Sequence, residues 1–453
     1  MRAEGEVMNV AVIGLGKLGL ATAAWLTEKR NVVWGYDINK ELVERVDNGA
    51  CPYPEPGLPE LLKQRLHSSL HLGKTFFEAT KEAEVVFIIV PTPSGADDRF
   101  VNDYVLQALE EMTFTIADRV ARGLHTTIVV VSTVMPGSCC GEFIPLLEQR
   151  TGLSSNTRPG WSLVYSPEFI ALGSVIHDLE HAPLYLIGAD DSDAARLVMH
   201  AYGTPSLDRV SLASHVNAEL AKLCLNVGVT FKMTFANIVG MLCEETPGAD
   251  VDQVLDVVGM DPRVGSKYLR SAGVGFGGPC FPRDVRAIVA LMADASLLPQ
   301  ADSLLPQADV NGLLLKRLRV KLEGKKVAVL GMTYKPGTPV TEESFGVELL
   351  QRDSSFTTWW DPAKPEWIEG ERASETMADT PYNACEGVDA IVITTNDPAW
   401  AMLDWAKIAA IAPNATVVDC WRVLRGRDLH GLKYTPCGIG PITAPAGGNE
   451  VGK

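Results

Sequence analysis

The segment of residues 273–284 contains the residues best suited to covalent chemistry. It has the sequence Gly-Val-Gly-Phe-Gly-Gly-Pro-Cys-Phe-Pro-Arg-Asp. Its glycines would let backbone amides approach an anionic or sugar ligand. A helix that begins after Pro282 would place Cys280 near a helix N-terminus, where a thiolate is stabilised. Asp284 would then lie one turn further on, within reach of the thiol or of a water molecule. The alternative is a glycine-rich turn around a buried cysteine.

A second glycine-rich turn, near the start of the chain, is typical of a dinucleotide-binding site. The β-prone residues 9–13 precede Gly-Leu-Gly-Lys-Leu-Gly, and a helix-like run and a second strand follow. In this pattern Gly14 permits a tight turn, Gly16 lets the backbone approach a pyrophosphate, and Gly19 lets the helix pack closely on the strand. The strand, turn and helix occur in the order that this fingerprint requires.

The acidic residue that ends the second strand indicates which dinucleotide would bind. Asp37 lies 18 residues after Gly19, where a carboxylate can accept hydrogen bonds from both ribose hydroxyls and would repel a 2′-phosphate. We therefore predict NAD rather than NADP as the cofactor. The candidate cofactor-binding residues are Gly14, Gly16, Lys17, Leu18, Gly19, Asp37, Thr92 and Thr133.

Three later runs are predicted to be buried strands whose ends could face a ligand. Residues 85–90 lead into Pro-Thr-Pro, residues 127–132 into Thr-Val-Met-Pro-Gly, and residues 162–165 into Ser-Pro-Glu-Phe. In an open parallel sheet, ligands bind outside the carboxyl ends of the strands. Thr133 and Glu168 would therefore lie at an active site. The alternatives are a threonine that caps a helix and a glutamate that is a solvated loop charge.

The middle of the chain has a helical pattern. From about residue 211 to 245 there is no proline and apolar residues recur at helical spacing, which predicts one long helix. Helical sequence continues to about residue 310. It includes residues 296–302, repeated identically as 303–309, which we interpret as a local duplication in a linker.

A second α/β region begins with a strand at residues 325–331 and continues with strands at 390–394 and 415–419. We therefore predict an α/β protein with two Rossmann-like doubly wound domains, joined by a long central helix and a helical dimerisation region. The expected domains are residues 1–210, which bind NAD, residues 211–310, which contain Cys280, and residues 311–453.

Composition excludes several classes of protein. Of the 453 residues, 46% are hydrophobic, and 40 basic against 56 acidic residues give a net charge of −16. No lysine or arginine cluster suggests a nucleic-acid-binding face, and the apolar runs are shorter than the roughly 20 residues of a membrane span. The nine cysteines follow no disulfide or zinc spacing, and the polar first residues suggest no signal peptide. We expect reduced thiols and a cytoplasmic location.

One histidine pair matches the H-x-x-E-H pattern of some zinc proteases. His177 and His181 flank Asp-Leu-Glu in a stretch that precedes Pro183. We predict a loop here, with no helix long enough to turn both imidazoles inward, and therefore no metal site.

The motifs together resemble those of the nucleotide-sugar 6-dehydrogenases, the UDP-glucose/GDP-mannose dehydrogenase family. The family signature is similar to GxGFGGxCFPKD, and here it is GVGFGGPCFPRD. The resemblance extends from residue 8 to about 425. It includes PYPEPGL with Gly57, STVMPG, SPEF, ELAK at residues 219–222 with Asn226, GMDPRVG at 259–265, and KPGT at 335–338.

The resemblance implies a four-electron oxidation of a nucleotide-sugar C6 alcohol to the uronic acid, as from UDP-glucose to UDP-glucuronate. Two NAD molecules would be used, with a thiohemiacetal and then a thioester on Cys280. The implied catalytic residues are Cys280, Lys222, Asn226, Asp284, Glu168 and Thr133. Contacts with the sugar nucleotide are implied for Glu168, Phe169, Lys222, Asn226, Arg263, Tyr268, Phe276, Gly277 and Lys335.

The implied roles are as follows. Lys222 and Asn226 would stabilise the developing oxyanion, Asp284 would hold a water or take a proton, and Glu168 would be the general base of hydrolysis. Lys335 would help residues 311–453 to bind the nucleotide. Arg263 of one subunit would reach the nucleotide sugar bound by the other, so we expect a homodimer.

The sequence departs from the family pattern at four places, one of which is Asp-Cys-Trp-Arg at residues 419–422 in place of a DGRN-like motif. Leu172 stands where the family commonly has a second glutamate, Arg283 replaces a lysine, and Glu342 replaces an arginine. Three alternatives remain open. The first is the same chemistry on a UDP-N-acetylhexosamine or GDP-mannose. The second is a family member with little turnover that only binds nucleotide ligands. The third is a single-step hydroxyacid dehydrogenase, which would have no use for Cys280.

Overall fold

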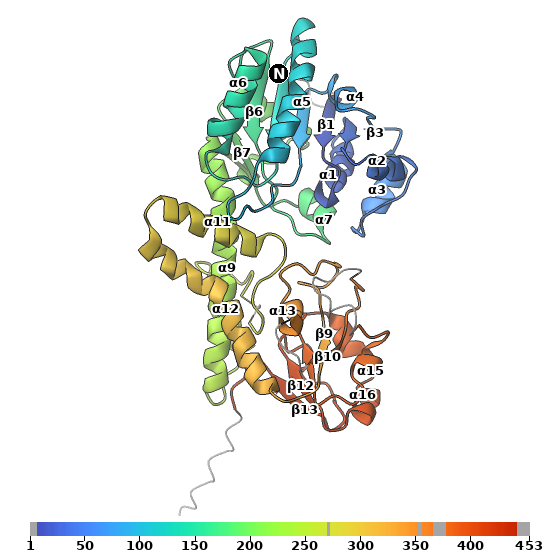
Figure 1. The fold of residues 1–453 in the computed structure, drawn as a ribbon, viewed down its shortest axis with the longest axis vertical. Helices are drawn as coiled ribbons and strands as arrows, with labels where there is room; N and C mark the ends of the chain where they lie inside the picture. Colours follow the sequence, from blue (N-terminus) through green and yellow to red (C-terminus); the bar gives the residue numbers. More distant parts are fainter. Residues whose placement is uncertain (1–6, 270–271, 352–355, 366–376, 442–453) are drawn as a thin grey trace, which may run out of the picture. The chain divides into compact units, whose positions relative to one another are not determined.

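The computed structural model describes residues 7–269, 272–351, 356–365 and 377–441, with backbone alone for residues 298–309 and 356–357 (Figure 1). The chain forms two compact units, Met1–Cys224 and Leu225–Lys453. Each unit is built around its own sheet.

The first unit contains an eight-stranded sheet in the order β3-β2-β1-β4-β5-β6-β7-β8. Its strands are β1 (Met8–Ile13), β2 (Asn31–Tyr36), β3 (Leu70–Leu72), β4 (Val85–Ile88), β5 (Thr126–Val130), β6 (Trp161–Tyr165), β7 (Tyr185–Ala189) and β8 (Val210–Ala213). Its helices are α1 (Lys17–Glu28), α2 (Lys40–Asp47), α3 (Leu58–Arg65), α4 (Phe76–Thr80), α5 (Asp103–Ala121), the π-helical turn η1 (Cys139–Phe143), α6 (Ile144–Thr151), α7 (Val175–Glu180), α8 (Ser192–Ala201) and the 3₁₀ turn η2 (Leu207–Arg209).

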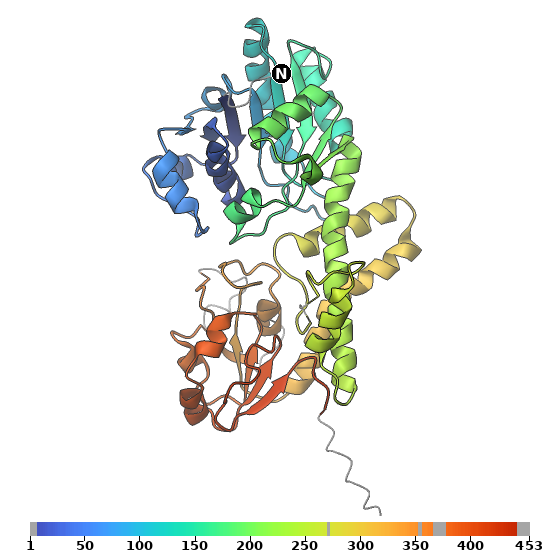
Figure 2. The same cartoon turned by 180° about the vertical axis from the view of Figure 1, so that it is seen from behind.

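Alternation along the strands gives this sheet two cores, because successive side chains of a strand face opposite sides. In β1, Met8, Val10 and Val12 belong to one buried cluster, and Ala11 and Ile13 belong to another. Helices α1, α3, α7 and α8 supply residues to the first cluster, and α4, α5 and α6 to the second (Figure 1, and from behind in Figure 2). The doubly wound arrangement is as predicted.

One feature of this sheet differs from the expected parallel arrangement. β7 pairs with β6 in the antiparallel direction, whereas the other neighbouring strands of this sheet are parallel. β8 also occupies residues 210–213, where we expected the long helix to begin.

The second unit contains a five-stranded parallel sheet in the order β10-β9-β11-β12-β13. Its strands are β9 (Val327–Leu330), β10 (Phe356–Trp360), β11 (Ala390–Ile393), β12 (Thr416–Asp419) and β13 (Lys433–Pro436). Its helices include α10 (Val251–Met260), α11 (Phe281–Asp294), α12 (Leu298–Leu322), α13 (Phe345–Gln351), α15 (Pro381–Ala384), the 3₁₀ turn η3 (Pro398–Met402) and α16 (Trp405–Ile411). In β9, Val327 and Val329 face one cluster, and Ala328 and Leu330 face the other. This confirms the second Rossmann-like domain.

The long helix α9 (His215–Glu245) has 31 residues, and the boundary between the two units falls within it, after Cys224. By length and composition α9 could cross a membrane. In this structure its buried polar side chains Glu219, Lys222 and Asn226 donate or accept hydrogen bonds within the protein, as in a core helix.

Two interpretations of local sequence were wrong. The repeated heptapeptides lie almost wholly within α12 and not in a linker, since this helix begins at Leu298 with a proline in its first turn, where proline is tolerated. His177 lies in the short helix α7 and not in a loop, and its ring stacks on that of His181 with centroids 4.5 Å apart.

Candidate active site

The first glycine turn has the geometry of a phosphate-binding loop. Gly14 has φ of +92°, which favours glycine, and its amide donates to the Tyr36 carbonyl at 2.8 Å. A Cβ on Gly19 would lie 1.9 Å from the Gly14 oxygen, whereas one on Gly16 would meet nothing within 4 Å. The backbone is therefore closely packed between Gly14 and Gly19. At Gly16, the N-cap residue of α1, there is space for a ligand. Lys17 and Leu18 follow in the first turn of this helix, whose free amides suit a pyrophosphate.

The carboxylate of Asp37 is fixed at the end of β2. Its Oδ2 accepts the Leu15 amide at 2.7 Å, and its Oδ1 accepts the Asn39 amide at 2.8 Å. Each carboxylate oxygen has a second lone pair. Asp37 is thus held beside the glycine turn while it keeps the capacity to accept ribose hydroxyls. The turn and this acid fit NAD.

The ends of β4 and β5 are joined by side chains. The hydroxyl of Thr92 donates to the Thr133 carbonyl at 2.7 Å, and that of Ser132 donates to the Val90 carbonyl at 2.6 Å. β4 pairs with both β1 and β5. Thr92 and Thr133 therefore lie at the carboxyl edge that also carries the glycine turn.

A buried acid that the sequence analysis did not single out as functional supports the turn after β5. Glu219 of α9 is fully buried, and its carboxylate accepts the Gly137 amide at 2.5 Å and the Cys139 amide at 2.8 Å. These amides lie at the start of η1, where helical backbone donors lack partners within the helix. Glu219 therefore ties the turn that contains Thr133 to the helix that carries Lys222.

Lys222, Glu168 and Phe169 form one group in the first unit. The Lys222 ammonium donates to the Glu168 carbonyl at 2.6 Å and lies 4.6 Å from the centre of the Phe169 ring. A cation over an aromatic face is attracted by its quadrupole. The ammonium is thus held against the loop that follows β6 by a backbone carbonyl and an aromatic ring.

The Glu168 carboxyl has an altered acidity. Burial raises its pKa to about 7, although the Lys222 ammonium and a hydrogen bond with Tyr202 act in the opposite direction. Tyr202 is itself buried, and its hydroxyl lies 3.1 Å from the Ser166 hydroxyl. A carboxyl with a pKa near 7 can exchange a proton efficiently at neutral pH. Glu168 is therefore not the solvated loop charge of the alternative interpretation.

Cys280, Asp284 and Asn226 form a second group, in the second unit. Cys280 is exposed and occupies the N-cap of α11, which begins at Phe281, two residues before the start that we predicted. The Asp284 amide donates to the Cys280 carbonyl at 2.9 Å, which places the two residues one turn apart. The Asp284 carboxylate is buried and accepts the Asn226 side-chain amide at 2.6 Å. Because Cys280 is exposed, the alternative interpretation, a glycine-rich turn around a buried cysteine, is wrong.

The loop before Cys280 packs tightly on the second Rossmann-like domain. A Cβ on Gly277 would lie 2.3 Å from the Glu343 carbonyl oxygen, so this position requires glycine. Phe276 is buried, and its amide and carbonyl bond to the Asn311 side chain at 3.1 and 2.6 Å. The loop conformation is therefore fixed from two sides.

The remaining predicted ligand contacts are scattered over the second unit. Arg263 is exposed and pairs with Asp261 at 2.5 Å. The Tyr268 ring meets that of Phe281, the residue after Cys280, edge-on at 6.5 Å. The Lys335 ammonium lies 5.7 Å from the centre of the Tyr334 ring. Tyr268 thus contacts the residue that follows Cys280.

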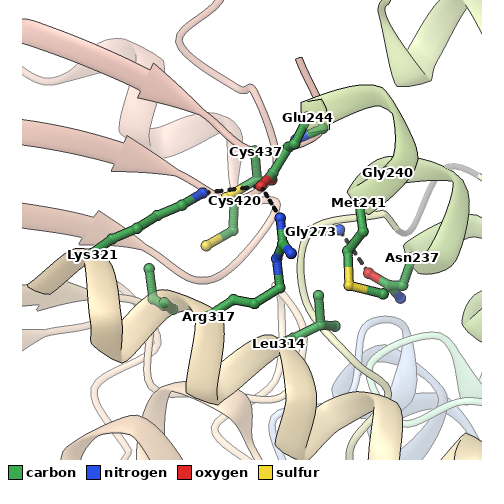
Figure 3. Close-up of a pocket in the computed structure, with 12 residues that line it drawn as sticks. Asn237, Gly240, Met241, Glu244, Gly273, Leu314, Arg317, Lys321, Cys420 and Cys437 are labelled. Carbon is green, nitrogen blue, oxygen red and sulfur yellow. Dashed lines mark hydrogen bonds and ion pairs between the residues drawn. The ribbon is translucent and has the colours of Figure 1, made fainter. Parts of the chain in front are cut away.

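A small cavity in the second unit is separate from this chemistry (Figure 3). The Glu244 carboxylate forms ion pairs with Arg317 and Lys321, each at 3.1 Å, and Cys420 and Cys437 also line the cavity. Its lining includes none of the predicted catalytic residues. Within the part of the chain that the structure describes, no group of three or more His, Cys, Asp or Glu side chains is arranged to hold a metal ion.

Comparison with known proteins gives matches along most of the chain. Three domain models of the UDP-glucose/GDP-mannose dehydrogenase family match in order: the NAD-binding domain over residues 8–205, the central domain over 216–307 and the UDP-binding domain over 328–426. The UDP-glucose 6-dehydrogenase AglM of Haloferax volcanii is 30% identical over 451 residues, which cover 94% of this chain and 99% of that protein.

Two further relatives differ in their substrates. The GDP-mannose 6-dehydrogenase of Pseudomonas putida is 33% identical over 349 residues, covering 76% of this chain and 78% of that protein. A solved UDP-glucose dehydrogenase from Pyrobaculum islandicum is 29% identical and superposes with a TM-score of 0.82, covering 97% of this chain and 99% of that one. The chain therefore belongs to the UDP-glucose/GDP-mannose dehydrogenase family of nucleotide-sugar dehydrogenases, and its cofactor is NAD.

Proposed function

We propose that this protein oxidises UDP-glucose to UDP-glucuronate in two NAD-dependent steps. The observation that carries the proposal is the exposed Cys280 at the N-cap of α11, with the buried pair of Asp284 and Asn226 one turn away. A single oxidation of an alcohol needs no thiol, whereas oxidation of an aldehyde to an acid benefits from a nucleophile that holds it as a thioester. The choice of UDP-glucose is supported by relatives that match nearly the whole chain.

The residues divide the work as follows. Bound NAD supplies the hydride acceptor for each oxidation. Between the two oxidations the Cys280 thiolate adds to the aldehyde carbon, and the oxygen that gains negative charge takes hydrogen bonds from Lys222 and Asn226. Asp284 accepts the Asn226 amide and thereby fixes the direction in which Asn226 donates. Thr133 contributes to NAD binding at the sheet edge that also carries the glycine turn.

The last step is hydrolysis of the thioester. Glu168 takes a proton from the attacking water, the bond between the carbonyl carbon and sulfur breaks, and the Cys280 thiolate is released with the acid product. The pKa of about 7 suits Glu168 to this task. We further propose that residues 311–453 hold the nucleotide, with Lys335 as one contact.

We also propose that the protein is a cytoplasmic homodimer. Phe231, Phe235, Ile238 and Leu242 of α9 are between 44% and 61% exposed, and their spacing of four, three and four residues places them on one helix face. An apolar stripe of this length on a soluble protein is typical of a protein–protein interface. Dimerisation would bring Arg263 within reach of the nucleotide sugar of the second subunit.

A substrate panel tests the proposal. UDP-glucose, GDP-mannose and a UDP-N-acetylhexosamine are each supplied with NAD. NADH formation is followed by absorbance, and the product is identified by mass spectrometry. We expect UDP-glucose to give the highest kcat/KM, with two NADH per sugar and no free aldehyde. Preference for another sugar would overturn the substrate assignment, and binding without turnover would overturn the activity.

The Cys280→Ala variant tests the covalent path. It should lose acid formation almost completely while it still reduces an added aldehyde with NADH. Cys140→Ala removes another exposed thiol and serves as the matched control. Acid formation close to that of the wild type by Cys280→Ala would show that the thiol is not the nucleophile.

A further inference from the structure

Glu55 is a buried acid to which no role has been assigned so far. It precedes α3 in the segment Pro-Tyr-Pro-Glu-Pro-Gly-Leu and is 6% exposed. Its Oε2 accepts the Gly173 amide at 2.8 Å, and its Oε1 accepts the Val175 amide at 2.7 Å. One carboxylate thus binds two backbone donors that lie more than a hundred residues away in the sequence.

These two amides belong to the loop that carries the general base of the proposed function. The loop leaves β6 at Ser166, contains Glu168 and Phe169, and ends where α7 begins at Val175. Its second half is also braced internally, since the Asp178 carboxylate accepts the Ala171 amide at 3.0 Å and the Ser174 hydroxyl at 2.8 Å. Glu55 connects this braced turn to a different part of the first unit.

The first half of the same loop is held by Lys222, which donates to the Glu168 carbonyl at 2.6 Å. The loop is therefore fixed at one end by a catalytic candidate and at the other by Glu55. Between the two ends lies Leu172, whose apolar side chain is partly buried against the first core cluster. It cannot supply the acceptor that a glutamate at this position would offer.

We propose that Glu55 is a positioning residue for thioester hydrolysis: it holds residues 168–175 so that Glu168 stays in place to activate water. This inference rests on the proposed function. A carboxylate is required because both of its oxygens accept. Glutamine has the same shape but offers one acceptor and turns its amide hydrogens toward a second donor.

The test compares four proteins: the wild type, Glu55→Gln, Glu55→Asp and the control Asp191→Asn. Asp191 is also a mostly buried carboxylate of the first unit, and it accepts the Ser162 hydroxyl at 2.8 Å and the Asp193 amide at 2.9 Å. Ser162 lies near the start of β6, at the opposite end of the strand from Glu168. The control therefore removes a comparable charge from the N-cap of α8, where the side chain bonds to the far end of β6 and makes no hydrogen bond to the described residues of the loop.

Two measurements are made on each protein. Hydrogen exchange followed by mass spectrometry reports the protection of residues 168–175 in the absence of substrate. Single-turnover kinetics with UDP-glucose and NAD separates NADH formation from acid release, and intact mass reports any thioester that remains on Cys280.

We expect faster exchange of residues 168–175 in Glu55→Gln and acid release slowed about tenfold to a hundredfold, with a thioester adduct on Cys280 and little change in NADH formation. Glu55→Asp, which keeps the charge, should fall between Glu55→Gln and the wild type, and Asp191→Asn should match the wild type in both measurements. Unchanged exchange in the loop, or equal slowing of both half-reactions, would overturn the inference.

If Glu55→Gln does not fold, Glu55→Asp decides by the same criteria. A wild type that forms no acid would refute the proposed function, and in that event the exchange data alone decide whether Glu55 holds the loop.

Discussion

The pH dependence of product release gives the sharpest test of Glu168. A general base works as the carboxylate, so the rate of thioester hydrolysis should fall as the pH falls through the pKa of this group. Burial raises that pKa to about 7. The ascending limb of the profile should therefore lie near neutral pH, and not near the value of 4.5 for an ordinary glutamate.

The size of the effect follows from the ionised fraction. With a pKa of about 7, about nine-tenths of Glu168 is ionised at pH 8 and about one-tenth at pH 6, so hydrolysis should slow roughly tenfold. With an unshifted pKa the carboxylate would be almost fully ionised at both pH values. The shift also affects stability, because the folded protein keeps this proton to a higher pH than the unfolded chain. The contribution of Glu168 to the unfolding free energy is thus greatest below pH 4.5 and declines as the pH rises toward 7.

The assay is single-turnover hydrolysis, in which the thioester on Cys280 is formed first and its decay is then followed after a jump to each pH between 6 and 8. Glu168→Gln serves as the control, since it cannot ionise. It should lose about 10²–10⁴-fold in rate, the usual cost of removing a general base, and should show no limb near pH 7. A flat wild-type profile, or the same limb in Glu168→Gln, would refute the assignment.

Three further outcomes follow from the geometry. Asp37→Ala should raise KM for NAD by about 10- to 100-fold, the effect of losing a charged hydrogen-bond acceptor, and should raise KM for NADP much less; equal effects would contradict the ribose contact. Gly19→Ala places a Cβ 1.9 Å from the Gly14 oxygen and should lower the unfolding free energy by about 1–3 kcal/mol in urea titrations, together with NAD affinity. Phe235→Lys puts a charge in the apolar stripe of α9 and should yield monomers in size-exclusion chromatography with light scattering, whereas an unchanged mass would exclude this face as the interface.

Local motifs made the cofactor turn and the helix start at Cys280 predictable. The spacing of Gly14, Gly16 and Gly19 follows from contacts within one strand, one turn and one helix. The helix start near Cys280 was predicted in the same way, from a glycine loop and a proline a few residues apart, whereas the role of this thiol was implied by the resemblance to the family. Strand β8 was missed because its burial is incomplete along all four residues, so that it lacks the clear alternation of a strand with one buried face.

The acids that support the loops could not be predicted in this way. Glu219 reaches amides about 80 residues earlier in the chain, and Glu55 reaches amides about 120 residues later. In the sequence both resemble surface acids on or near a helix, and charged residues are rarely fully buried without a partner. Only the packing of the sheet shows that their partners are backbone amides of the loops after β5 and β6.

Glu342, which replaces an arginine of the family pattern, precedes Glu343, and the backbone of both residues contacts the loop before Cys280. The Gly278 amide donates to the Glu342 carbonyl at 3.1 Å, and Gly277 packs against the Glu343 carbonyl. These contacts do not depend on the side chains. The Glu343 carboxylate in turn meets the Arg286 guanidinium of α11 at 2.8 Å. The charge at residue 343 is therefore matched by a cation on the helix that Cys280 caps, and the departure leaves the support of the loop in place.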